Sequence, residues 1–106
     1  MTVAKVEEAS IVVIGVVEEE DGRYVAYCRE LGTSSFGDTL EAAFENLGDA
    51  IDVHLDGLEE VGELVQFLRE RNINIRIHSD DDVLLSVPLG KPLKSYQRHV
   101  QMPVLV

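Results

Sequence analysis

The sequence has a single cysteine, few cationic residues and no long apolar run. Cys28 is the only cysteine in 106 residues, so no disulfide can form within the chain, which fits a reducing cytoplasm. Lysine and arginine total 9 against 20 aspartates and glutamates, a formal charge of −11. Such a chain repels nucleic acid and membrane headgroups, so we expect weak or no direct nucleic-acid binding. The longest apolar run, residues 11–17, is far below the roughly 18 residues of a spanning helix.

Signatures of catalysis are also missing. There is no phosphate-binding loop, no glycine-rich dinucleotide turn, no pair of cysteines or histidines at zinc spacing and no nucleophile elbow. His78 and the aspartates at 80–82 are residue types that bind cations, but consecutive aspartates on one turn diverge, so we interpret them as a solvated turn. His54 is interpreted as a histidine at a helix edge and Cys28 as a core residue. We expect no enzyme activity, cofactor or metal.

The first half of the chain predicts a hairpin followed by a third strand. Asp21-Gly22 suits the two positive φ angles of a type I′ turn, which would join a strand at 10–20 to one at 23–28. The unbroken apolar stretch of the first strand is typical of a central strand buried on both faces. Residues 33–36 could add a short strand, completing an antiparallel meander.

Two helices should follow. Apolar residues from Leu40 to Leu55 recur at helical spacing and predict a helix over residues 39–56, capped by Asp38 with Glu41 and ended by Gly57. A second apolar stripe predicts a helix that begins after Gly57 and ends at Asn72. The solvent face of the first helix is acidic.

The rest of the chain predicts strands at 74–78 and 83–89. We therefore expect an α+β fold in which helices cover one face of a two-layer antiparallel sheet, in the order β-β-β-α-α-β-β. Residues 1–89 would form this domain. Residues 90–106 would form a C-terminal tail that is first basic and then apolar.

The stretch from Asp21 to Leu55 resembles a known family. It reads G-x-Y-V-A-x-C-x-E-L, then Gly-Asp-Thr, then L-E-A-A-F-E-N-L-x-x-A-I. This order is similar to that of the HicB antitoxins and their stand-alone relatives, over about half of the chain. The resemblance implies a non-catalytic antitoxin that binds a small basic ribonuclease toxin, blocks its active histidine and covers its RNA surface. The DNA-binding segment of full-length members is not evident here.

These considerations give two sets of candidate residues. The partner-binding set is Phe36, Glu41, Glu45 and Asp49. A homo-oligomer interface is expected in the apolar end of the tail, at Val100, Met102, Val104 and Leu105. The alternative function is that of a homo-oligomeric structural or small-ligand-binding protein that has lost its toxin, and a worn-down hydrolase resembling ribonuclease H is a third interpretation.

Overall fold

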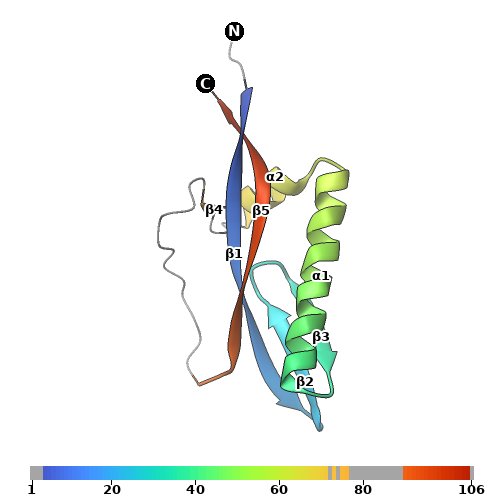
Figure 1. Ribbon diagram of the computed structural model, residues 1–106. Helices are drawn as coiled ribbons and strands as arrows, with labels where there is room; N and C mark the ends of the chain where they lie inside the picture. Colours follow the sequence, from blue (N-terminus) through green and yellow to red (C-terminus); the bar gives the residue numbers. More distant parts are fainter. Residues whose placement is uncertain (1–3, 72, 74, 77–89, 106) are drawn as a thin grey trace.

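The computed structural model describes residues 4–71, 73, 75–76 and 90–105, and it confirms the α+β fold and its element order. Helices lie on one face of an antiparallel sheet (Figure 1). The elements are β1 (Ala4–Glu20), β2 (Arg23–Cys28), β3 (Thr33–Gly37), α1 (Leu40–Glu60), α2 (Leu64–Glu70), β4 (Ile75–Arg76) and β5 (Leu93–Leu105). The molecule is elongated, with extents of 59 × 29 × 19 Å.

β1 is the central strand, as its apolar sequence predicts. Gly15 lies opposite Cys28 of β2 and also opposite Lys94 of β5, so β2 and β5 flank β1 on its two edges. β3 continues the sheet beyond β2, and β4 makes a short pairing with Ser10 and Ile11. At the β1–β2 turn, Asp21 and Gly22 have φ angles of 51° and 78°, which confirms the type I′ geometry.

β5 lies within residues 90–106, which the sequence suggests as a tail. It pairs with β1 over its full length, from Leu93 opposite Val16 to Leu105 opposite Ala4. β4 falls within the predicted strand at 74–78. The predicted strand at 83–89, the turn at 79–82, His78 and Asn72 lie outside the described residues.

α1 corrects two predictions. The helix runs through Gly57 to Glu60, because a helical glycine costs only about 1 kcal/mol and the apolar stripe continues to Leu58. Its N-cap is Thr39 rather than Asp38, since the Thr39 hydroxyl accepts the N–H of Ala42 at 3.0 Å. The second helix accordingly begins at Leu64, later than expected.

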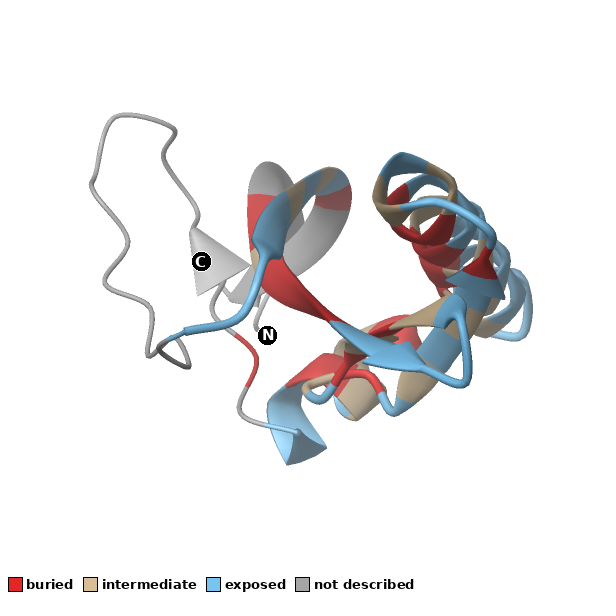
Figure 2. Cartoon of the chain, turned by 90° about the horizontal axis from the view of Figure 1, so that it is seen from below, coloured by how far each residue is buried: buried red, intermediate tan, exposed pale blue. Residues whose placement is uncertain are grey.

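The core lies between the sheet and the helices (Figure 2). Its most buried side chains include Ile11, Leu31, Leu47, Leu55 and Leu68. At the edge of this core α1 approaches β3 closely: a Cβ on Gly37 would lie 2.6 Å from the backbone nitrogen of Ala43. Only glycine allows this approach.

Candidate partner-binding surface

The solvent face of α1 carries an acidic stripe that spans the length of the helix. Its members recur at intervals of three and four residues, so they lie on one side of the helix, and all of them are exposed. We call them the acidic stripe: Glu41, Glu45, Asp49, Asp52, Asp56 and Glu59.

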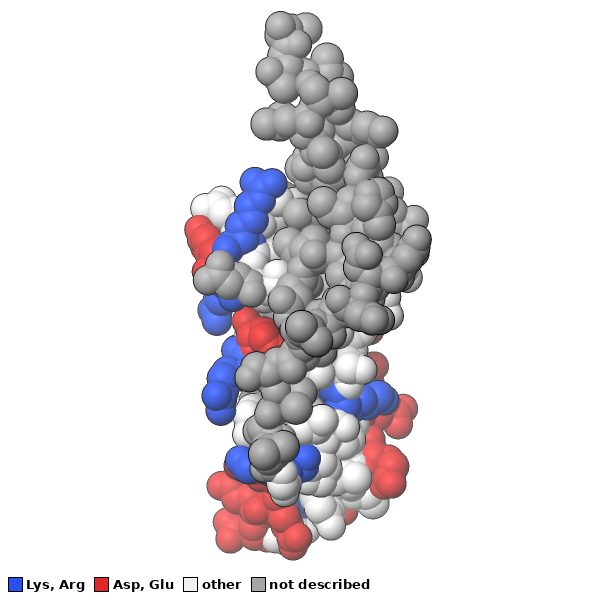
Figure 3. Space-filling model, turned by 90° about the vertical axis from the view of Figure 1, so that its left-hand side faces the viewer, with Lys and Arg blue, Asp and Glu red and all other residues white. Residues whose placement is uncertain are grey.

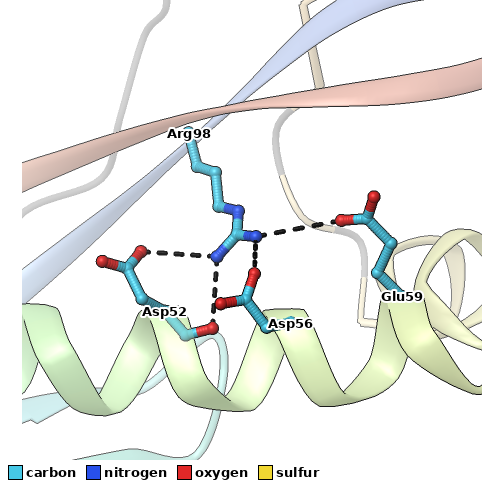
Figure 4. Close-up of polar contacts among 4 residues, drawn as sticks. All are labelled: Asp52, Asp56, Glu59 and Arg98. Atoms are coloured by element: carbon cyan, nitrogen blue, oxygen red, sulfur yellow. Dashed lines mark hydrogen bonds and ion pairs between the residues drawn. The ribbon is translucent and has the colours of Figure 1, made fainter.

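Arg98 of β5 reaches the C-terminal half of this stripe (Figure 4). Its guanidinium lies 3.4 Å from the Asp52 carboxylate and 3.8 Å from that of Glu59, and it also contacts Asp56. The Arg98 side chain is only 22% exposed, and it donates a further hydrogen bond to the backbone oxygen of Asp52 at 3.2 Å. One cation is therefore shared by three carboxylates and offsets one of their three charges.

The N-terminal half of the stripe has no such partner. Within the part of the chain that the structure describes, Glu41, Glu45 and Asp49 make no ion pair. We call these three residues the open acids. They are three of the four predicted partner-binding residues, and the structure places them together on the first turns of α1.

Phe36, the fourth predicted residue, lies on a different surface. Its neighbours Ser35 and Gly37 turn toward the helix layer, so Phe36 projects from the opposite face of the sheet, where it is 55% exposed. The Arg23 guanidinium lies 4.2 Å from the centre of its ring. Asn46 of α1 donates to the backbone oxygen of Phe36 at 2.9 Å. Phe36 and the open acids thus flank β3 from two sides without meeting.

A shallow groove of about 550 Å³, largely open to solvent, lies between the beginning of β3 and α1. It is lined by residues 32–34 of the loop and strand and by Asp49, Ala50, Val53 and His54 of the helix. Asp49 belongs to both the groove and the open acids, so the two form one continuous surface. Sequence analysis missed this groove. The signal for it is Val53, an apolar residue on the polar side of the helix that is 72% exposed.

His54 has a structural role in this groove wall. Its ring packs edge-to-face against Phe67 of α2, with 5.2 Å between centroids. Its Nε2 atom is buried and has no hydrogen-bond partner among the described residues.

Burial raises the pKa of the Cys28 thiol to about 11, which keeps it protonated and unreactive at neutral pH. The described residues include no group of three or more metal-ligating side chains.

The predicted oligomer-interface residues all lie in β5. Val100 is buried in the core, at 3% exposure, opposite Ala9. Met102, Val104 and Leu105 continue the strand, and each is paired in register with a residue of β1.

A second acidic region lies at the β1–β2 turn. It consists of Glu18, Glu19, Glu20 and Asp21, all exposed, and Figure 3 shows acidic atoms gathered at this end of the molecule. Lys91 binds the Glu18 carboxylate and holds the pKa of that carboxyl below its usual range. Among the described residues, the charge of this region is thus partly compensated, whereas that of the open acids is not.

No family model, curated protein or solved structure matches this chain. None of the described helices is long and apolar enough to cross a membrane. The fold and the acidic surface of α1 are therefore the observations from which a function can be inferred.

Proposed function

We propose that the chain is a non-catalytic partner-binding module, similar to a HicB antitoxin, that binds and neutralises a small basic ribonuclease toxin. The observation that carries the proposal is the split of the acidic stripe. Arg98 pairs with the carboxylates of its C-terminal half and offsets one of their three charges, whereas Glu41, Glu45 and Asp49 have no cation among the described residues. Such uncompensated carboxylates favour a cationic partner.

A ribonuclease that binds RNA has to present a cationic surface, because its substrate carries a negative charge at each phosphate. The open acids can attract that surface from a distance and speed the encounter. The adjoining groove adds exposed Val53 and the loop at residues 32–34, which can accept an apolar side chain of the partner. Charge would steer association and the groove would contribute to holding the complex.

The test uses a small basic chain encoded next to this one. The variant Glu41→Gln/Glu45→Gln/Asp49→Asn removes three charges from the proposed surface. The control, Glu19→Gln/Glu20→Gln/Asp21→Asn, removes the same charge at the distant β1–β2 turn. We expect the first variant to slow association at low salt about ten-fold relative to the control, with the difference fading at high salt. Equal association rates in the two variants would reject the open acids as the interface.

Absence of catalysis is the second part of the proposal. We expect the purified chain to leave RNA and phosphoesters intact, with or without Mg²⁺ or Mn²⁺. Turnover that His54→Ala abolishes would contradict this proposal. Direct binding to DNA or RNA should be weak and should vanish at moderate salt, as measured by fluorescence anisotropy.

A homo-oligomeric structural protein is the second candidate function. The 13-residue strand β5 at the edge of the sheet favours it, because long strand edges can pair with a further chain. Such a protein would self-associate but would bind no basic neighbour.

A further inference from the structure

The two outer edges of the sheet differ in how far they are protected. β3 is five residues long, and its outward carbonyl at Phe36 is already bonded by Asn46. β5 is 13 residues long and, within the described part of the chain, pairs with β1 alone. A long strand edge presents a row of backbone donors and acceptors that can pair with another strand.

One hydrogen bond shows which backbone N–H and C=O groups of β5 point away from β1. The N–H of Val17 donates to the backbone oxygen of Pro92 at 3.1 Å, in line with the β1–β5 register. Because backbone groups alternate in direction along a strand, the even-numbered residues of β5 face β1 and the odd-numbered residues face outward. The outward residues are Leu93, Ser95, Gln97, His99, Gln101, Pro103 and Leu105.

These outward positions suit pairing with another strand. None of them is Asp, Glu, Lys or Arg, although such residues make up 27% of the chain. Pro103 also lies at an outward position, so its missing N–H leaves the ladder with β1 intact. The two cations of β5, Lys94 and Arg98, lie at positions whose backbone groups face β1, and the outward row holds one residue that commonly protects an edge strand, Pro103.

The far end of the β1–β5 pair also needs further support. Among the described residues, residues 4–9 of β1 pair with β5 only, since the pairing of β1 with β4 begins at Ser10 and its pairing with β2 begins at Gly15. This two-stranded ribbon extends past the end of α1, where both termini lie (Figure 1). An isolated two-stranded ribbon is at best marginally stable in water, whereas a sheet of three or more strands with a hydrophobic face can be stable on its own.

We propose that the outer edge of β5 pairs antiparallel with β5 of a second copy of this chain. A twofold axis at residue 99 sets Leu93 opposite Leu105 of the second copy, so the strands overlap over their full length. The order becomes β1-β5-β5-β1, and each ribbon gains two strands. In this register Lys94 faces residue 104 and Arg98 faces residue 100, both valines, so no like charges stand opposite each other.

The hydrogen bonds on which the proposal depends are those of Ser95, Gln97 and Gln101. Gln97 would exchange two backbone hydrogen bonds with residue 101 of the second copy, and symmetry repeats the pair. Ser95 would face Pro103, where one hydrogen bond of the pair is missing. The contact between the His99 ring and the Ser10 hydroxyl, at 3.1 Å, is compatible with this arrangement.

The first test removes one outward N–H. Gln97→Pro removes it, and Gln97→Ala keeps it while deleting the same side chain. We expect the wild type and Gln97→Ala to have twice the 11.8 kDa chain mass by light scattering. Gln97→Pro should raise the dimer dissociation constant about a hundred-fold, with an unchanged circular dichroism spectrum. A monomeric wild type, or a Gln97→Pro variant that remains fully dimeric, would overturn the proposal.

The second test reads the register and does not depend on the proline variant. Residue 99 alone faces its own counterpart, so His99→Cys should form a covalent dimer under mild oxidation. In Gln97→Cys the two thiols would be four residues apart along the strands and should not link. The wild type, whose Cys28 is buried, should remain non-covalent. Cross-linking at 97 rather than 99 would refute this register. Neither test depends on the toxin-binding surface of α1.

Discussion

Replacing Gly37 by alanine tests the close approach between β3 and α1. A Cβ at this position would lie 2.6 Å from the nitrogen of Ala43 and 2.8 Å from the carbonyl carbon of Ala42. Both are backbone atoms of α1, so no side-chain rotation can relieve the overlap. Ordinary van der Waals contact begins near 3.4 Å, so the start of α1 would have to move by about 0.8 Å.

We expect Gly37→Ala to lower the free energy of unfolding by about 1–3 kcal/mol, the usual cost of overpacking. In a domain of this size each kcal/mol lowers Tm by about 4–8 °C. The control is Gly57→Ala in the same helix, where an added Cβ meets no atom within 4 Å. That substitution should stabilise the protein by about 0.5–1 kcal/mol, because alanine loses less backbone entropy than glycine in a helix.

Urea unfolding followed by circular dichroism measures both variants. The reasoning would be refuted by a Gly37→Ala variant as stable as the wild type. It would equally be refuted if Gly57→Ala proved the more destabilising of the two. Either result would mean that α1 can move away from β3 without cost, and the close approach would then have no structural role.

Three further predictions concern β5 and the core. Arg98→Met should cost about 0.5–1.5 kcal/mol of unfolding free energy at low salt, and the loss should shrink in 1 M NaCl because the three carboxylates are largely exposed. Tyr96→Phe should cost about 0.5–1.5 kcal/mol in urea unfolding, since its hydroxyl donates to the backbone oxygen of Phe44 at 2.6 Å. Burial raises the pKa of Cys28 from 9.0 to about 11 and that of Tyr96 from 10.0 to about 12, so folding keeps both groups protonated. The free energy of unfolding should thus be highest below pH 9 and fall as the pH rises from about 9 to about 12. In Cys28→Ala this decline should begin only near pH 10. A flat urea midpoint between pH 8 and pH 11.5 would contradict the last prediction.

Much of the fold can be predicted because local signals agree with the tertiary arrangement. The Asp21-Gly22 turn requires positive φ angles that few other residues adopt, and the apolar spacing along α1 marks the buried side of the helix. The boundaries of α1 were less predictable. Asp38 and Thr39 are both good N-caps, and the choice between them depends on the path by which the chain leaves β3.

The extent of β5 could not be read from local sequence. Prolines at 88, 92 and 103 argue against a ladder unless their direction relative to the partner strand is known. In the structure Pro103 faces outward and therefore costs no hydrogen bond with β1.

The candidate partner-binding surface could likewise be predicted only in part from the sequence. The open acids were predictable from helical spacing, but the contact between Arg98 and Asp52 joins residues far apart in sequence. The one sequence signal for this contact is that the helix is acidic and the C-terminal segment is basic. The groove beside Val53 arises from how the loop at residues 32–34 lies against α1, which no periodicity encodes.

The pairing of β1 with β5 has a consequence for how the chain acquires its structure during synthesis. β1 emerges first from the ribosome, but β5, its longest partner, emerges only after the five intervening elements β2, β3, α1, α2 and β4. Contacts between such distant segments form slowly, because a long loop has to close first. Until then one edge of an apolar strand is open to other nascent chains, so the protein should depend on chaperones during translation more than a helical domain of equal size.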